Sequence, residues 1–511
     1  MPVQPPSQRP LRPSAPPSTS IAALADTLDA RLIGSDVSVT GVELRAQAVL
    51  PGDLFAALPG AKAHGAEFAQ TAIDRGAVAV LTDLAGAAYL GADCAVPLLV
   101  HSQPRAILGA VSARIYGNPS ERMTVIGITG TSGKTTTAYL VEAGLKAAGR
   151  KPGLIGTIET RIDGHRVPSA LTTPEAPQLH ALFAVMLEQG IDCVVMEVSS
   201  HALSLGRVDG TRFGVGAFTN LSQDHLDFHK TFDEYFAAKA RLFGRDSAVR
   251  AQQAVVCIDD DWGRQMAGVA GDSAVTVSTT GSADWTVREI VTADDGSQTF
   301  DIVGPTGVLR AEVRLPGRYN VANALLALAA CATSGVSPVL AAQGIATVDV
   351  PGRVEKVERG QDFLAVVDYA HKPDALEKVI STLREDTSGR IAVVIGAGGD
   401  RDAEKRPIMG AVGARLADLL VVTDDNPRSE VAATIRAAVL AGARAEAGSA
   451  EIREIGDRAA AIADAVAWAR AGDVVLVAGK GHETGQEING VKHPFDDREV
   501  LASAIDRRVR G

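Results

Sequence analysis

Short runs of apolar and β-branched residues alternate along the chain with longer amphipathic stretches, and most runs end in glycine or polar residues. Such runs are typical of buried parallel strands, because a strand covered by helices on both faces carries apolar side chains on both. Their alternation with helical stretches predicts an α/β fold built on parallel sheets. The clearest strand candidates are residues 123–129, 193–198, 214–221, 363–370, 390–398, 418–425 and 473–481.

The length of 511 residues suits about three domains, since one hydrophobic core rarely serves more than about 200–300 residues. Residues 1–19 contain seven prolines and no aromatic residue, and we expect a disordered tail there. A helical stretch over 21–32 opens the ordered part, and 116–123 is expected to be a linker. The predicted organisation is a small α/β domain over 20–120, a central P-loop parallel-sheet domain over 121–350, and a C-terminal doubly wound, Rossmann-like domain over 351–511.

Composition supports this fold class and narrows the partners. With 46% hydrophobic residues, only 4% aromatics and 51 glycines, the chain suits an α/β protein better than a β-sandwich. The net charge of −11 argues against general affinity for nucleic acid or anionic membranes, which depends on clustered Lys and Arg. Four widely spaced cysteines indicate reduced thiols, and no apolar run approaches a membrane span. We expect a soluble cytoplasmic monomer.

A glycine-rich segment follows the first strand of the central domain and starts a helix. In this order of strand, loop and helix, backbone N–H groups can hold phosphate oxygens while Lys134 neutralises the terminal phosphates. Thr135 or Thr136 would offer a hydroxyl to magnesium. The usual pattern has glycine where this chain has Ile128, so the loop is a variant, and a glycine turn with an incidental lysine is the alternative. The predicted nucleotide loop comprises Gly130, Thr131, Ser132, Gly133, Lys134, Thr135 and Thr136.

Glu197 ends the buried strand candidate over 193–197, where a standard P-loop protein carries a magnesium-binding Asp. A lone carboxylate on a buried strand is costly without a partner, which favours a functional role for this one.

Several motifs together resemble the Mur ligases, a family of ATP-dependent amide-bond ligases. The first group, in the central block, is residues 130–136, 197–201 and 220–227. The resemblance continues through LPGRYNVANALLAL, VDYAHKPDAL, GAGGDRDAEKRPIMG, DDNPRSE and AGKGHE at 315–328, 367–376, 396–410, 424–430 and 478–483. It covers nearly everything after the tail. The later motifs are most similar to the family members that add diaminopimelate.

The resemblance implies a two-step reaction. A carboxylate of UDP-N-acetylmuramoyl-L-alanyl-D-glutamate attacks the γ-phosphate of ATP, and the amine of meso-2,6-diaminopimelate then attacks the acyl phosphate, in peptidoglycan precursor synthesis. It also implies magnesium held by Glu197 with Thr135 and by His225, and a carbamylated lysine at Lys239. Carbamylation would turn a cation into an oxygen-rich anion suited to magnesium, whereas an ordinary surface lysine on a helix is the alternative.

The resemblance also implies nucleotide contacts outside the loop. Asn320 would lie near the base, although an Asn at the start of a helix is more often a cap. Asp368 and His371, at a strand end, would contact the nucleotide from the third domain, and Asp368 suits a ribose hydroxyl. A turn-forming Asp is the alternative for Asp368.

Selection of diaminopimelate over lysine requires a receptor for a second carboxylate, and guanidinium binds carboxylate with two parallel hydrogen bonds. Arg428 follows a strand candidate and Pro427 stiffens its loop, whereas a solvated surface arginine is the alternative. The resemblance implies that this pocket also contains Arg401, Asp425, Asn426, Gly479 and Glu483, with Glu483 facing the distal ammonium. It assigns the muramoyl peptide to Thr172, Thr173, Ser199 and Arg207, and the uridine to residues 41–68, where Leu44 replaces an expected hydroxyl residue.

Three other functions remain open on the sequence. A lysine-adding Mur ligase and a folylpolyglutamate synthase are relatives of similar chemistry, and Arg428 within DNPR tells against both. A P-loop switch ATPase is the alternative from another class, and it would hydrolyse ATP without an amino-acid acceptor.

Overall fold

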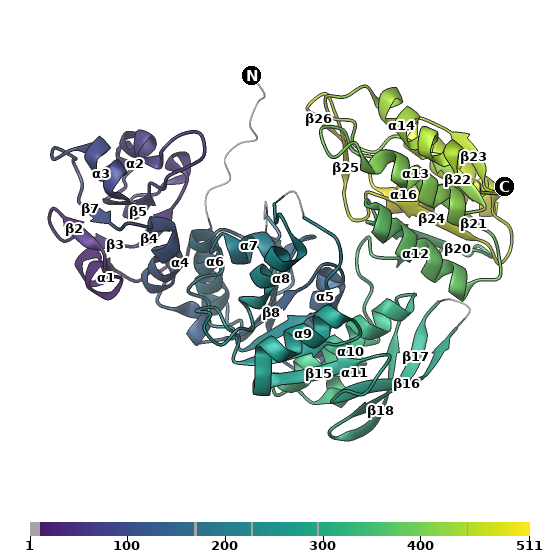
Figure 1. Ribbon diagram of the computed structural model, residues 1–511, viewed down its shortest axis with the longest axis horizontal. Helices are drawn as coiled ribbons and strands as arrows, with labels where there is room; N and C mark the ends of the chain where they lie inside the picture. Colours follow the sequence, from purple (N-terminus) through teal and green to yellow (C-terminus); the bar gives the residue numbers. More distant parts are fainter. Residues whose placement is uncertain (1–10, 168–170, 226–227, 294–295, 447, 511) are drawn as a thin grey trace.

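The computed structural model describes residues 11–510 except 168–170, 226–227, 294–295 and 447. In this part of the chain three main sheets follow one another along an arc, with helices packed on them (Figure 1). Their strands lie within residues 31–100, 124–313 and 355–478. The predicted α/β class is confirmed, while the domain boundaries at 120 and 350 stay predictions.

The first sheet has the strand order β2-β7-β6-β5-β4, and its strands are parallel except for β2 at the edge. The expected helix over 21–32 ends early: Thr27 is its last residue, and Arg31–Ile33 instead forms edge strand β2 against β7. The elements are β1 Thr19–Ser20, α1 Ile21–Thr27, β2 Arg31–Ile33, β3 Ser38–Val39, β4 Gly41–Glu43, η1 Ala46–Ala48, β5 Asp53–Ala56, η2 Gly65–Phe68, α2 Ala69–Asp74, β6 Ala79–Thr82, α3 Leu84–Leu90, β7 Leu98–Val100, α4 Pro104–Ile115 and η3 Pro119–Glu121.

The central sheet has the order β11-β10-β9-β12-β8-β13-β14-β15-β16-β17-β18 among the described residues. Its strands are β8 Thr124–Thr129, β9 Pro152–Ile155, β10 Thr160–Ile162, β11 His165–Val167, β12 Cys193–Glu197, β13 Val215–Phe218, β14 Gln253–Cys257, β15 Ala274–Ser278, β16 Trp285–Thr292, β17 Gln298–Gly304 and β18 Gly307–Val313. Its helices are α5 Lys134–Ala147, α6 Ala176–Glu188, α7 Ser200–Ser204, α8 Phe232–Ala240, α9 Asp261–Ala270, η4 Gly271–Ser273, α10 Arg318–Thr333 and α11 Pro338–Ile345.

Side chains of β8 alternate between two cores. Ile126 and Ile128 pack with α5, α10 and α11, whereas Val125 packs with α6 to α9 on the other face. Burial on both faces explains the continuous apolar runs. The expected parallel sheet is correct for the middle of the sheet, the strands β9, β12, β8, β13, β14, β15 and β16 in spatial order. It is incomplete at the two edges, where β10 and β11 on one side and β17 and β18 on the other add antiparallel strands.

The third sheet has the order β19-β20-β24-β21-β22-β23, parallel except for β19. Helices α12 to α14 cover one face (Figure 1). Helices α15 and α16 cover the other, as a doubly wound sheet requires. The elements are β19 Glu355–Lys356, β20 Leu364–Asp368, α12 Pro373–Asp386, β21 Ile391–Ile395, α13 Lys405–Leu416, β22 Leu419–Val422, α14 Ala432–Ala445, β23 Glu451–Glu454, α15 Arg458–Trp468, β24 Val474–Ala478, the hairpin β25 Gly485–Ile488 and β26 Val491–Pro494, and α16 Asp497–Arg510.

The predicted disordered tail is wrong for residues 11–19, while residues 1–10 lie outside the described part. The Arg12 guanidinium is 12% exposed, donates to Asp53 at 3.1 Å and lies 3.8 Å from the buried carboxylate of Glu43. Ser14 donates from its backbone and hydroxyl to Glu188 on α6. Proline content misled the prediction, because one arginine with two buried carboxylate partners is enough to order the segment.

Within the described part of the chain, every helix falls short of the length and apolarity that a membrane crossing needs. The four cysteines are free thiols, and Cys193, Cys257 and Cys331 are buried.

We predict that Arg12→Met destabilises the first domain by about 3 kcal/mol, because it leaves the buried carboxylate of Asp53 without its cation and leaves Glu43 with Arg45 alone. The measurement is the midpoint of the first unfolding transition in urea. Arg75→Met, at an exposed position of the same domain, is the control. Equal midpoints for the two variants would contradict the role given to Arg12.

Candidate active site

The phosphate loop lies at the carboxyl ends of β8 and β13. Gly130 and Gly133 have φ of +147° and +85°, and a Cβ on Gly130 would stand 1.8 Å from Thr219 Oγ1. Lys134 begins α5 directly after this turn. Ile128, the departure from the usual pattern, lies inside β8 with its side chain in the core. The departure therefore leaves the loop itself intact.

Neighbouring segments hold the loop in shape. The backbone N–H groups of Thr131 and Ser132 donate to Asn220, and Lys134 Nζ donates to the carbonyls of Gly130 at 2.9 Å and Thr131 at 2.8 Å. Burial lowers the pKa of Lys134, while Glu197 and Asp224 oppose that shift. Lys134 thus lies against the loop at the N-terminus of α5, the kind of place where backbone N–H groups can hold phosphate oxygens.

Glu197 ends β12 and is 1% exposed. Thr135 Oγ1 lies 3.0 Å from each of its carboxylate oxygens. Thr157 donates to it twice, from the backbone N–H at 2.7 Å and from Oγ1 at 3.1 Å. Three donor groups from two segments, two hydroxyls and one backbone N–H, offset the burial of this carboxylate. Thr157 was not predicted, since a Thr in the turn after β9 carries no signal in the sequence.

Three of the four residues expected to contact the muramoyl peptide lie close to Glu197, and Arg207 lies further away. Thr172 Oγ1 lies 3.1 Å from Thr157 Oγ1, and Thr173 Oγ1 donates to the Glu197 carbonyl at 2.8 Å. Ser199 is the N-cap of α7. Arg207 follows α7 and forms an ion pair with Glu175 at 2.8 Å.

Lys239 and His225 lie on the other side of the loop. Lys239 is 1% exposed, and its Nζ donates to Gly130 O at 2.8 Å. Burial lowers the pKa of Lys239 well below its usual value, and nearby Lys134 adds to the effect. The alternative of an ordinary surface lysine is therefore wrong. Burial also lowers the pKa of His225 to about 4, so its ring is neutral at pH 7.

The described residues contain no group of three or more His, Cys, Asp and Glu side chains arranged for a metal. Leu226 and Asp227, which end the motif over 220–227, lie outside the described residues.

Two cations from the third sheet's part of the chain reach the loop. Arg353 lies 3.5 Å from Thr135 Oγ1 through one guanidinium nitrogen, and Lys372 forms an ion pair with Asp224. Neither was predicted as a site residue. Their positions follow from how the segments pack, which a linear motif does not record.

The predicted nucleotide contacts take part in local bonding. Asn320 lies inside α10, whose N-cap is Gly317, so the capping alternative is wrong. Its Nδ2 donates to Pro316 O, and its Oδ1 accepts from Asn323.

Asp368 accepts the backbone N–H groups of Val354 and Ala370, each at 2.8 Å, which is the turn-forming role considered as its alternative. Burial lowers the pKa of His371 to about 4.

The residues expected to bind the amine donor gather at the carboxyl ends of β22 and β24. Asn426 Nδ2 donates to Glu483 Oε2 at 2.9 Å, and a Cβ on Gly479, whose φ is +119°, would stand 3.0 Å from Asp425 Oδ2.

Arg428 is not a free surface side chain. It donates to Gly399 O at 2.6 Å and pairs with Glu487 at 3.3 Å, while Arg401 approaches the same loop near Gly398.

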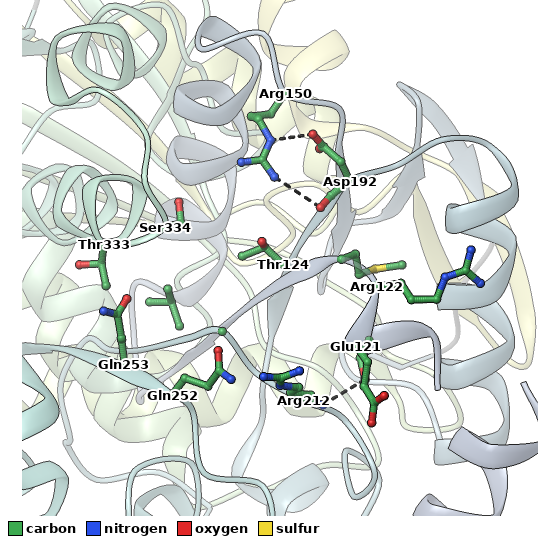
Figure 2. A pocket seen from close by; sticks show the side chains of 14 residues that line it. Glu121, Arg122, Thr124, Arg150, Asp192, Arg212, Gln252, Gln253, Thr333 and Ser334 are labelled. Carbon is green, nitrogen blue, oxygen red and sulfur yellow. Dashed lines mark hydrogen bonds and ion pairs between the residues drawn. The ribbon is translucent and has the colours of Figure 1, made fainter. Parts of the chain in front are cut away.

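A cavity of about 550 Å³ opens at the other end of the central sheet (Figure 2). Arg150 pairs with Asp192 at its wall, and Arg212 and Thr124 also line it. None of the predicted site residues lines this cavity. The predicted site residues lie instead at the carboxyl ends of the strands, where ligands of open α/β sheets bind. The cavity and the candidate active site are therefore separate places on the central sheet.

Three segments match descriptions of one family: residues 38–116 the "Mur ligase family, catalytic domain", residues 128–331 the "Mur ligase middle domain", and residues 352–481 the "Mur ligase, glutamate ligase domain". A protein of Corynebacterium efficiens named UDP-N-acetylmuramoyl-L-alanyl-D-glutamate--2,6-diaminopimelate ligase is 58% identical over 459 residues, 88% of this chain and 87% of that one. The chain belongs to the Mur ligase family.

Two further relatives cover almost the whole Mur ligase chain. A Streptomyces avermitilis protein of the same name is 52% identical over 505 residues, 98% of each chain. A solved structure titled with that name is 32% identical, covers 96% of this chain and 100% of its own, and has a TM-score of 0.69. The resemblance stated from the motifs is confirmed.

We predict that Thr157→Val lowers kcat for ligation about tenfold to a hundredfold, because it removes one of the hydroxyl donors that fix the Glu197 carboxylate. Thr160→Val is the matched control, since Thr160 is a buried threonine of the neighbouring strand β10 and its Oγ1 has no hydrogen-bond partner among the described residues. The measurement is phosphate release with saturating substrates. Equal kcat for the two variants would show that Thr157 is not needed to position Glu197.

Proposed function

We propose that this Mur ligase uses ATP to join meso-2,6-diaminopimelate to UDP-N-acetylmuramoyl-L-alanyl-D-glutamate in peptidoglycan precursor synthesis. Relatives at 52–58% identity carry the name of that activity. The observation that carries the proposal is the pairing of two sites at sheet ends: a phosphate loop with Lys134 beside Glu197, and an amine-donor group around Arg428 and Glu483.

In the first step an oxygen of the dipeptide carboxylate forms a bond to the γ-phosphorus, and ADP leaves with the electrons of the broken bond. In the second step the amine nitrogen forms a bond to the acyl carbon, phosphate leaves, and the nitrogen loses a proton. Both steps crowd anions together. Lys134, Arg353 and Lys372 supply fixed cations near them, and such preorganised charge is the main means of catalysing phosphoryl transfer.

Magnesium is part of the proposal. Glu197 and Thr135 provide oxygen ligands, and neutral His225 and a carbamate on Lys239 complete the proposed set. When bound, the ion would neutralise phosphate charge. Lys239 suits carbamylation because burial and Lys134 favour its neutral amine, the form that reacts with carbon dioxide. Asn320, Asp368 and His371 are proposed to contact the nucleotide.

The acceptor is proposed to bind between the first and central sheets. Thr172, Thr173 and Ser199 line the approach to Glu197, with Arg207 beyond them, and residues 41–68 are proposed to hold the uridine.

Four free thiols fit a reducing compartment, so we place the enzyme in the cytoplasm, and a monomer stays our prediction.

We predict that the wild-type enzyme forms the tripeptide with diaminopimelate and not with lysine, and that Arg428→Ala raises KM for diaminopimelate about a hundredfold while KM for ATP stays the same. The carboxylate of the distal head would lose its guanidinium partner. Arg444→Ala, at an exposed position on α14, is the control. Product formation is measured by mass spectrometry.

Each failure has a distinct meaning. Equal use of both amino acids would overturn the diaminopimelate assignment, and a glutamate-adding activity would indicate a folylpolyglutamate synthase. Phosphate release that is independent of any amine would support the switch ATPase.

We predict that removal of dissolved carbon dioxide lowers kcat and that bicarbonate restores it, because the carbamate on Lys239 forms reversibly. Lys239→Ala should be inactive and unresponsive to bicarbonate. Lys146→Ala, at a half-exposed lysine of α5, should keep the response of the wild type. A wild-type enzyme indifferent to carbon dioxide, with an unmodified amine at Lys239, would contradict the carbamate.

A further inference from the structure

Lys480 is a buried cation beside the amine-donor group, and no predicted role includes it. Its side chain is 0% exposed, although lysine is among the residues least often buried. Nζ donates to Asn426 Oδ1 at 2.9 Å and to Gly485 O at 2.9 Å, and it lies 3.2 Å from Asp425 Oδ1. The ammonium therefore has partners on three sides, and it does not point to solvent.

Lys480 fixes the orientation of the Asn426 amide. Asn426 Oδ1 also accepts the backbone N–H of Glu487 at 2.9 Å, so both donors meet the same oxygen. With the oxygen turned toward these donors, the amide nitrogen must face the opposite way, where Nδ2 donates to Glu483 Oε2 at 2.9 Å. A flipped amide would set Nδ2 against an ammonium and an N–H group. The position of Glu483 thus depends on Lys480 through one intervening side chain.

Lys480 also balances charge at this site. Asp425 and Glu483 place two carboxylates near one ammonium, with Glu483 Oε2 3.8 Å from Lys480 Nζ. Arg428 and Arg458 also face Glu483, but each has a carboxylate partner of its own, Glu487 and Asp497 respectively. One negative charge therefore remains over, which suits a cationic amino group as the incoming ligand. Without Lys480 the two carboxylates would repel each other, and Glu483 would take up a proton more readily.

We infer that Lys480 is the positioning residue of the amine-donor site: through Asn426 it holds Glu483 in place and ionised to receive the ammonium of the distal head of diaminopimelate. This inference rests on the proposed function. It adds Lys480 to the proposed site as a residue that acts on the ligand through Asn426 and Glu483. It also gives a reason for the burial of this lysine in the loop after β24.

The pH dependence of the reaction offers a readout that a purely structural lysine would not move. Burial and Asp425 raise the pKa of Glu483, whereas Asn426, Lys480 and Arg428 lower it. Removal of the Lys480 charge raises this pKa further. Because binding of an ammonium requires ionised Glu483, the acidic limb of kcat/KM for diaminopimelate must then move to higher pH. The charged and titratable groups that face Glu483 are Asp425, Lys480, Arg428, Arg458 and Tyr369.

The experiment compares Lys480→Met with the wild type and with Lys492→Met, an exposed lysine on the neighbouring hairpin. We expect Lys480→Met to raise KM for diaminopimelate about tenfold to a hundredfold, to shift the acidic limb upward, and to leave KM for ATP unchanged. In a Glu483→Gln background the same substitution should have little further effect, because both changes act on one contact. If Lys480→Met does not fold, Lys480→Gln, which keeps a polar head group in the buried space, is measured in the same way.

The outcomes separate the inference from the proposed function. A wild type that ligates diaminopimelate, with a lysine variant that keeps its KM and its acidic limb, overturns the inference alone. Additive effects of Lys480→Met and Glu483→Gln also overturn it. A wild type that ligates no diaminopimelate overturns the proposed function and this inference with it.

Discussion

The carboxylate of Glu197 is the group on which the arrangement of the central site depends. It is buried at the end of β12, and a charge in that place destabilises the fold unless donors surround it. Thr135 from the phosphate loop and Thr157 from the turn after β9 supply those donors. Satisfying one carboxylate therefore ties together the ends of neighbouring strands and fixes the first turn of α5, which carries the loop.

The cations of the site come from separate parts of the chain. Lys134 belongs to the loop, whereas Arg353 and Lys372 approach from the segment that leads into the third sheet and from the start of α12. A protein with a net charge of −11 thereby concentrates positive charge where anions must meet. In the amine-donor group, by contrast, Asp425 and Glu483 place two carboxylates around the single buried ammonium of Lys480.

Features that a single segment specifies were predictable from the sequence. Continuous apolar runs located the parallel strands. The loop after β8, Glu197 and the DNPR loop were expected at strand ends, where parallel strands meet ligands, and the structure places them there. Antiparallel edge strands such as β17 and β18 were missed because half-exposed strands lack the continuous apolar pattern.

Contacts between distant segments were beyond the reach of the sequence. Arg12 orders a proline-rich segment through carboxylates on other strands, and Thr157, Arg353 and Lys480 gain their roles only when the chain has folded. Each is a common residue type with no motif around it, and only its burial and partners distinguish it from surface residues of the same kind.

In the proposed function, Glu197 links the phosphate loop to a nucleotide-bound magnesium ion. Calorimetric titration of ATP into the wild type and Glu197→Gln, with and without magnesium, tests it most directly. The account predicts that magnesium strengthens binding to the wild type and has little effect on the variant, while the two bind metal-free nucleotide alike. Retention of the full magnesium dependence by Glu197→Gln would contradict it.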